Sequence, residues 1–218
     1  MRISITGTSC QGKSTLIKDM MKEWTGMKMP DTSYRSLLKK GKHSKNTSED
    51  VQWKILNQMV DEQQKYTSDD KIIFDRCPLD NIAYTMWANA KGIVSDKFVE
   101  KCIPIVKESM RFLDIIFFIP ITKSFPVEIE DNGNREVDKY YIEEIDHILK
   151  TIYAQWREDT DVFFPKDDSP AIIEIFGSPE ERIQMVKLYL DNDGDAIGEQ
   201  GIINPTEMAE LQKMFGLE

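Results

Sequence analysis

The sequence has few cysteines, few histidines and no long hydrophobic run, and each shortage excludes a class of protein. Its three cysteines show no C-x-x-C spacing, so we expect neither a disulfide framework nor a cysteine zinc site. Its two histidines are too few and too widely separated for a typical zinc site, and neither has the partner pattern of a catalytic triad. No segment approaches the roughly 18 to 20 consecutive apolar residues that span a bilayer, and the N-terminus turns polar too early for a secretory signal. We therefore expect a cytoplasmic protein that does not enter a membrane.

Positive charge is also scarce. The 28 Lys and Arg residues face 38 Asp and Glu residues, which gives a formal charge of −10 at pH 7. That sign disfavours proteins that work on nucleic acids or on anionic lipid. The length of 218 residues, 40% of them hydrophobic, suits one compact domain. Any phosphate ligand must therefore be bound by a local motif rather than by the overall electrostatic field.

Short apolar runs alternate with longer stretches of helical periodicity, which is typical of a parallel sheet covered by helices. Five runs predict strands, at residues 2–6, about 27–32, 71–75, 114–119 and 171–176. The run at 114–119 is apolar throughout, which favours a central strand covered on both faces. We expect an α/β fold with a five-stranded parallel sheet in a domain of residues 1–190. Residues 191–218 predict an acidic linker and a C-terminal helical extension.

The strongest motif follows the first strand. It matches G-x-x-x-x-G-K-[ST] without a gap, and its residues are Gly7, Thr8, Ser9, Cys10, Gln11, Gly12, Lys13, Ser14 and Thr15. The glycines let backbone N–H groups point at a phosphate, and the helix that begins near Lys13 adds its positive end. Lys13 is expected to reach the β- and γ-phosphates, and the Ser14 hydroxyl is expected to bind Mg²⁺.

Asp75 ends the third predicted strand, IIFD. The carboxyl end of a strand is the edge where open α/β sheets bind ligands. A carboxylate at this position suits a Walker-B type residue that holds Mg²⁺ through water, whereas the alternative is a residue that caps the next helix.

The residues that follow resemble the D-R-S-P-[IL]-D…A-Y signature of small P-loop kinases, which include thymidylate-kinase-like and nicotinamide-riboside-kinase-like proteins. Here the signature is Asp75-Arg76-Cys77-Pro78-Leu79-Asp80 with Ala83-Tyr84. Further landmarks are the DNGNR loop after the fourth strand and GSPEER after the fifth. The resemblance covers residues 1 to about 190 and implies a P-loop NTPase fold, with the phosphate loop at the middle of the sheet and a helical lid at about 121–140. Cys77 departs from the serine or tyrosine frequent in relatives.

The resemblance also implies roles for other residues. Arg76 would contact the acceptor or the transferring phosphate, and the alternative is a surface salt bridge. Arg135 falls where the lid arginine of the family falls, although it could equally be a solvated loop charge. Gly177, Ser178 and Pro179 resemble the loop that packs against adenine. Arg182 would stack on the base or pair with a neighbouring glutamate.

The sequence leaves the acceptor open. Asp31 lies where related nucleoside kinases place a base near the acceptor hydroxyl, but an Asp before Thr and Ser is also ordinary turn chemistry. Tyr34 and Arg35 could instead hold a nucleoside monophosphate. The predicted function is an ATP- and Mg²⁺-dependent phosphotransferase that acts on a small-molecule nucleoside or (deoxy)nucleoside monophosphate.

Two other functions compete with this prediction. A P-loop ATPase switch would couple hydrolysis to a partner, and its GTPase version is disfavoured because the chain lacks an N-K-x-D motif. The basic segment 35–45 raises the possibility of a kinase that acts on a modified base in phage DNA. The overall acidity of the protein argues against this function. The amphipathic segment 205–215 could dock on its own domain or on the second subunit of a homodimer.

Overall fold

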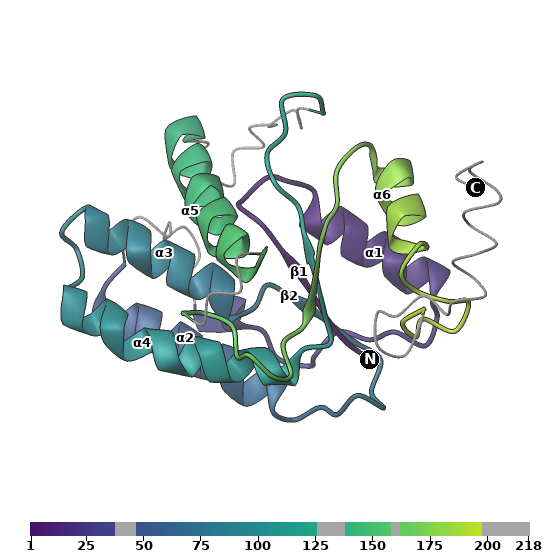
Figure 1. Cartoon of the computed structure of the whole chain (residues 1–218), viewed down its shortest axis with the longest axis horizontal. Helices are drawn as coiled ribbons and strands as arrows, with labels where there is room; N and C mark the ends of the chain where they lie inside the picture. Colours follow the sequence, from purple (N-terminus) through teal and green to yellow (C-terminus); the bar gives the residue numbers. More distant parts are fainter. Residues whose placement is uncertain (38–46, 126–137, 158–161, 198–218) are drawn as a thin grey trace.

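The computed structural model describes residues 1–37, 47–125, 138–157 and 162–197. Within these ranges, the strands are β1 (Arg2–Thr6), β2 (Ile72–Asp75), β3 (Ile115–Phe118) and β4 (Ala171–Glu174) (Figure 1). The α-helices are α1 (Lys13–Glu23), α2 (Glu49–Gln63), α3 (Pro78–Ala90), α4 (Asp96–Ser109), α5 (Lys139–Arg157) and α6 (Pro179–Val186). Two short 3₁₀ helices are η1 (Tyr34–Leu37) and η2 (Met110–Phe112). Residues 126–137 of the expected lid, which include Arg135, and the expected helix at 205–215 lie outside the described residues.

The four described strands form one parallel sheet in the order β2-β1-β3-β4. Ile3 in β1 is in register with Ile73 of β2 on one side and with Ile115 of β3 on the other. Since β1 is an inner strand, the loop that follows it opens within the carboxyl edge of the sheet rather than at its side. The predicted α/β class and the position of the phosphate loop are confirmed.

The predicted number of strands is wrong by one. The segment at 27–32 makes only a single parallel bridge, between Lys28 and Ile72 of β2. Two backbone hydrogen bonds of 2.8 Å flank that bridge, from Lys28 N to the Lys71 carbonyl and from Ile73 N to the Lys28 carbonyl. Pro30 follows two residues later and has no N–H group with which to continue a ladder. The fifth strand is therefore reduced to one bridge at the edge of the sheet.

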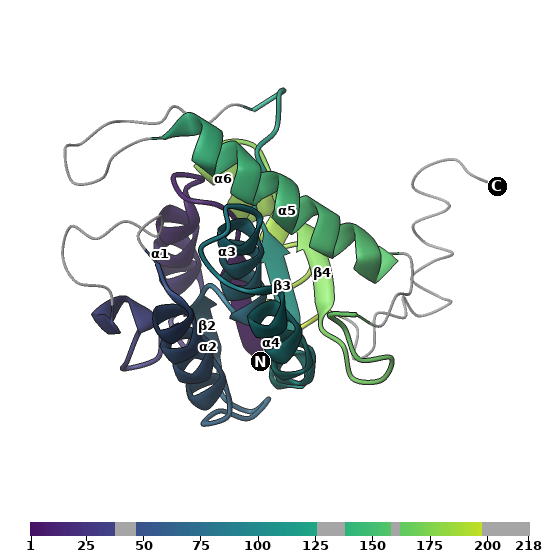
Figure 2. The same cartoon turned by 90° about the vertical axis from the view of Figure 1, so that its left-hand side faces the viewer.

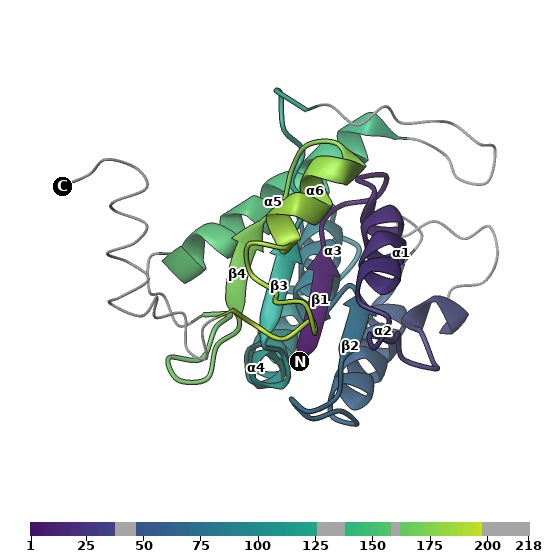
Figure 3. The same ribbon diagram turned by 90° about the vertical axis from the view of Figure 1, so that its right-hand side faces the viewer.

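Helices cover both faces of the sheet (Figures 2 and 3). The core on the α1 and α6 face contains Ile73 and Phe117, and the core on the face of the other four helices contains Phe74 and Phe118. Neighbouring residues of one strand thus point into opposite cores, as the pleat requires. This two-sided burial explains why the strand sequences are apolar throughout instead of alternating.

The longest described helix, α5, has 19 residues and packs against α3. Its Tyr141, Ile145 and Leu149 are buried, as their spacing predicts, whereas Tyr140 is 81% exposed. Among the helices in the described ranges, none has the length and hydropathy needed to cross a lipid bilayer.

Candidate active site

The phosphate loop between β1 and α1 requires glycine near both ends. Gly7 has a φ of +136°, and a Cβ atom there would lie 2.5 Å from the carbonyl oxygen of Ile119. Gly12 has a φ of +76° and is the N-cap of α1. Side chains other than hydrogen are strained in this region of φ, so the two glycines of the motif are demanded by the backbone itself.

Three elements outside the loop hold it in place. The Gly7 N–H donates to Oδ1 of Asp80 in α3 over 3.2 Å. The Thr8 hydroxyl donates to the carbonyl of Ile142 in α5 over 3.0 Å. From α6, Nη1 of Arg182 donates over 2.6 Å to the carbonyl of Gln11. The loop is therefore fixed before any ligand binds.

Lys13 begins α1 and is only 6% exposed. Its Nζ donates to the carbonyl of Thr8 within the loop. Burial, and next the positive charge of Arg76, lowers the pKa of Lys13 well below its usual value, while Asp80 acts in the opposite direction. An anionic ligand would favour the charged form of this lysine.

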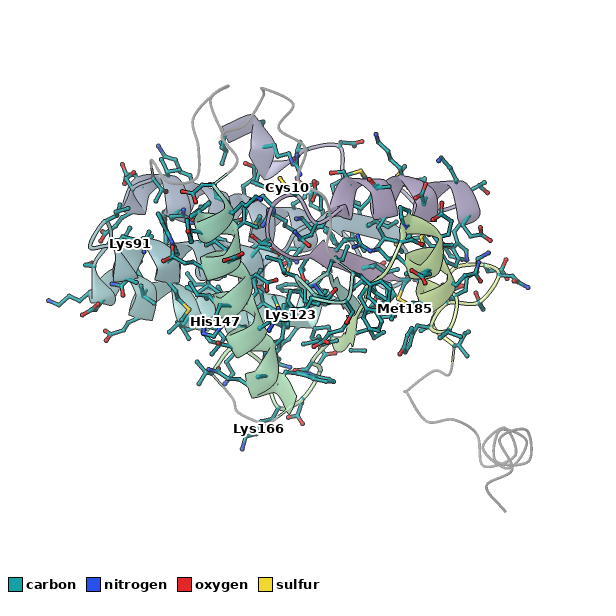
Figure 4. The ribbon with its side chains drawn as sticks, turned by 90° about the horizontal axis from the view of Figure 1, so that it is seen from above. Cys10, Lys91, Lys123, His147, Lys166 and Met185 are labelled. Carbon is teal, nitrogen blue, oxygen red and sulfur yellow. The ribbon has the colours of Figure 1, made fainter. Side chains whose placement is uncertain are left out.

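The remaining side chains of the motif differ in burial. Gln11 is buried, Ser9 and Cys10 are partly buried, and Ser14 and Thr15 are exposed. Figure 4 looks down on this edge of the sheet, with Cys10 labelled in the loop. Exposed hydroxyls at the start of α1 can reach a ligand without any change in the fold.

Asp75, at the end of β2, lies beside a basic side chain. Its Oδ2 accepts from Nη2 of Arg35 in η1 over 2.5 Å. Its Oδ1 is buried and has no hydrogen-bond partner among the described residues. The Asp75 carboxylate thus keeps one oxygen unpaired at the carboxyl edge of the sheet.

Arg76 has a φ of +79°, which is unusual for a residue with a side chain. Its Nη1 lies 3.1 Å from Oδ1 of Asp80, and its guanidinium lies 5.0 Å from the ring centroid of Tyr84. Both members of the Arg76–Asp80 pair are almost completely buried. The pair therefore differs from the exposed surface salt bridge that was the alternative interpretation.

Asp80, a residue of the kinase-like signature for which the sequence predicts no role, is a functional candidate in the structure. It is fully buried, and besides Arg76 it accepts from the N–H groups of Gly7 and Cys77. Burial raises the pKa of Asp80, while Arg76 opposes that shift. Its position three residues after the N-cap Cys77 could have predicted a helix cap. Its contact with the phosphate loop has no sequence signal.

An open cavity of about 500 Å³ lies between the phosphate loop and α6. Gly12, Thr15 and Leu16 line one side, and the expected base-binding residues Gly177, Ser178 and Pro179 line the other, together with Glu181, Arg182, Ser124 and Phe125. The rings of Phe125 and Phe176 stack with centroids 5.8 Å apart. The structure therefore brings two motifs that are far apart in the sequence onto one cavity.

The metal ligands expected from the sequence fit Mg²⁺. Mg²⁺ takes oxygen ligands and usually keeps several waters, so one or two protein groups suffice. The exposed Ser14 hydroxyl and the unpaired Asp75 Oδ1 are groups of this kind. Within the described residues, no cluster of three or more His, Cys, Asp or Glu side chains forms a dedicated metal site.

A second, smaller cavity of about 50 Å³ lies beside Asp75. Tyr34, Asp75 and Arg76 line it, with residues of α2 that include Gln63. Both amide atoms of Gln63 are buried without a hydrogen-bond partner in the described part of the chain. Asp31 does not line this cavity; it is exposed and near enough to Tyr66 to raise the pKa of that residue, after burial and Glu62.

The parallel order of the strands, with a glycine-rich loop leading from β1 into α1, defines a P-loop nucleotide-binding protein. A model of the AAA domain family matches residues 2–160, and the chain belongs to this family. A search of curated proteins finds no significant match in sequence.

Solved structures share the P-loop kinase fold with this chain. A deoxyadenosine kinase from M. mycoides, solved with dCMP and dCDP, matches with a TM-score of 0.61 at 16% identity over 86% of this chain and 97% of that one. A NadR protein in complex with NR matches with a TM-score of 0.61 at 15% identity over 92% of this chain. The match covers 53% of the NadR chain, so this chain spans about half of that protein. At these identities the likeness concerns the fold alone.

Proposed function

We propose that this protein is an ATP- and Mg²⁺-dependent phosphotransferase whose acceptor is a nucleoside or a (deoxy)nucleoside monophosphate. One observation carries the proposal. Buried Lys13, the unpaired oxygen of Asp75 and the two arginines Arg35 and Arg76 lie at one edge of the sheet, where Arg76 and Arg35 both lower the pKa of Lys13. The kinase fold of the solved neighbours supports it.

The donor would occupy the phosphate loop and the larger cavity. Backbone N–H groups of residues 7–15 would bind the phosphates, and Lys13 would hold the β- and γ-phosphates. The base would lie in the 500 Å³ cavity, with the loop from Gly177 to Pro179 on one side and the start of α1 on the other. This placement leaves the γ-phosphate directed toward Asp75 and Arg76.

Phosphoryl transfer asks the protein mainly to position its reactants and to balance charge. When bound, Mg²⁺ would neutralise charge on the phosphates, and Ser14 and Asp75 would hold it. Arg76, which is buried and fixed by Asp80, would contact the transferring group or the acceptor. Arg135 remains our candidate for a lid arginine and lies outside the described residues.

The acceptor site would lie at the smaller cavity beside Asp75. A nucleoside acceptor would use Asp31 as a general base. A monophosphate acceptor needs no base and would use Arg76, which lines the cavity, and Arg35, which donates to the lining residue Asp75. Asp31 is exposed and does not line this cavity, which favours the monophosphate.

Acceptor-dependent ADP release tests the proposal. The panel contains nucleosides, deoxynucleoside monophosphates, nicotinamide riboside and an oligonucleotide with a modified base, with product detected by mass spectrometry. We expect ADP and a phosphorylated small molecule in equal amounts, and Lys13→Met should abolish both. Lys18→Met, an exposed lysine of the same helix, is the matched control and should leave turnover unchanged.

The outcome separates the competing functions. ADP release that ignores every acceptor would reject the kinase and favour an ATPase switch. Product found only on the oligonucleotide would favour the DNA-modifying alternative. Normal turnover by Lys13→Met would reject the phosphate loop as the donor site.

A further inference from the structure

Arg182 occupies a position that neither sequence-based alternative described. It is the fourth residue of α6 and is only 5% exposed. Its Nη1 donates over 2.6 Å to the carbonyl of Gln11 and would lie 2.7 Å from a Cβ atom placed on Gly12. The guanidinium therefore packs on the backbone of the phosphate loop, directly against Gly12.

The charge of Arg182 has no counter-charge in the described part of the chain. Among these residues, no carboxylate forms an ion pair with it, and its Nε is buried without a hydrogen-bond partner. The neighbouring Glu181 is engaged elsewhere, since its Oε2 accepts from the N–H of Ser178 over 2.7 Å. Burial accordingly lowers the pKa of Arg182. A buried cation of this kind is costly unless an anion joins it.

The cavity shows where such an anion would sit. Arg182 lines it together with Gly12 and Thr15 of the phosphate loop and with Gly177 and Pro179 of the expected base-binding loop. In a phosphate loop, the backbone holds the α- and β-phosphates and the lysine reaches the β- and γ-phosphates. Arg182 therefore lies between the base and the phosphates that Lys13 would hold.

We propose that Arg182 binds the α-phosphate of the nucleotide, so that Arg182 and Lys13 hold opposite ends of the triphosphate. The proposal rests on the proposed function only in placing an adenine nucleotide in the phosphate loop. It gives α6 a direct part in nucleotide binding and accounts for an arginine that is buried without a protein carboxylate. Charge-assisted hydrogen bonds from Nε and Nη to a phosphate would satisfy the unpaired donor of Arg182 and supply its counter-charge.

Nucleotide binding without metal tests this role. Displacement of a fluorescent mant-ADP by adenosine, AMP, ADP and ATP in EDTA reports on the site that mant-ADP occupies, even where adenosine or AMP also binds at the acceptor site. Arg182→Met should weaken AMP, ADP and ATP by a similar factor of at least tenfold and leave adenosine unchanged. Lys13→Met should weaken ADP and ATP far more than AMP. Lys187→Met, just after α6, is the matched control and should change none of them.

Three results would overturn the proposal. If Arg182→Met weakens adenosine as much as AMP, the arginine contacts the base or shapes the cavity. If it weakens no ligand, Arg182 serves only the packing of the loop. Arg182→Lys keeps the charge and should retain part of the AMP affinity, which keeps the test valid even if the methionine variant folds poorly. Arg182→Gln removes the charge. Equal losses of AMP affinity in folded Arg182→Lys and Arg182→Gln would also reject a charge-based role.

This experiment is independent of catalysis. A protein that binds nucleotides in the predicted pattern but phosphorylates no acceptor would refute the kinase and leave the role of Arg182 standing. Normal kinase turnover together with unaltered AMP affinity in Arg182→Met would refute the role of Arg182 and leave the kinase standing.

Discussion

Asp31 and Arg35 are four positions apart, and their surroundings differ. Asp31 is exposed and near Tyr66, while Arg35 donates to the carboxylate of Asp75 over 2.5 Å. A carboxylate base serves a hydroxyl acceptor, whereas a guanidinium serves an anionic one. These two residues therefore distinguish the two classes of acceptor.

We predict that Arg35→Gln raises the KM for a monophosphate acceptor about tenfold or more, the usual cost of losing one hydrogen bond to a charged group. Asp31→Asn should then leave kcat nearly unchanged. With a nucleoside acceptor, Asp31→Asn should instead lower kcat by about a hundredfold or more, the usual contribution of a general base. Steady-state kinetics of the two variants with the preferred acceptor checks this, and a hundredfold loss in Asp31→Asn would reverse our preference.

The helix α6 joins local sequence signals to the candidate site. Ser178 caps it: the Ser178 Oγ accepts from the Glu181 N–H over 3.2 Å, the Glu181 carboxylate accepts in return, and Pro179 is the first helical residue. The cap fixes the start of the helix one turn before Arg182. An element of eight residues thus positions the expected base-binding loop and the buried arginine together.

Ser178→Ala should remove the cap and lower the free energy of unfolding by about 1 kcal/mol. Because the cap orients Arg182, we also expect weaker ATP binding. The matched control is Ser48→Ala, which removes the cap of α2, where Oγ accepts from the Val51 N–H over 3.3 Å. Denaturant unfolding and ATP titration are the measurements. Equal stability losses with equal ATP affinities in the two variants would show that the cap has no part in binding.

At the edge of the sheet, one predicted strand forms only a single bridge. The segment at 27–32 has the apolar character of a strand, yet it contributes one bridge at Lys28. Pro30 ends the pairing, and the chain continues toward η1, which carries Arg35. The loss of a fifth strand therefore leaves room for the segment that places a cation on Asp75.

At the scale of the whole molecule, the protein has a net charge of −10, whereas the candidate site gathers positively charged side chains. Lys13, Arg35, Arg76 and Arg182 are four cations near the phosphate loop of an acidic protein. Lys13 and Arg182 are buried, and the side chain of Arg76 is only 9% exposed. The overall charge therefore opposes long polyanions, while this edge of the sheet suits one small polyphosphate.

The buried thiols predict how stability depends on pH. Burial, and next Asp80, raises the pKa of Cys77, and burial raises the pKa of Cys102 to about 11. In the unfolded chain thiols titrate near about 8.5, so above that pH the unfolded state loses protons that the folded state keeps. The stability that these thiols contribute is complete below about pH 8.5, and it falls as the pH rises.

We expect the free energy of unfolding to decline from about pH 8 to 9.5, and to decline less steeply in Cys77→Ala and Cys102→Ala. Cys10→Ala, at a partly exposed position, is the control and should keep the wild-type slope. Urea unfolding under reducing conditions at each pH measures these slopes. Because slopes are compared, any loss of stability that a substitution causes at neutral pH cancels. Parallel slopes in all four proteins would contradict the prediction.

Residues close together in the sequence allowed much of the protein to be predicted. The strand, glycine-rich loop and helix from Arg2 to Glu23, the alternation of strands and helices, and the cap at Ser178 are all local, because backbone hydrogen bonding and side-chain periodicity act over a few residues. These features determined the fold class and the phosphate loop.

Only the tertiary structure decided what surrounds that loop. The contacts of Asp80 with Gly7, of Arg35 with Asp75 and of Arg182 with Gln11 join residues 73, 40 and 171 positions apart. No periodicity or cap links residues at such separations, since their contact depends on the order of the strands and on which helices cover each face. The sequence by itself therefore determined the fold class and the position of the phosphate loop, and the packing of α3, η1 and α6 around the sheet decided which charged side chains surround that loop.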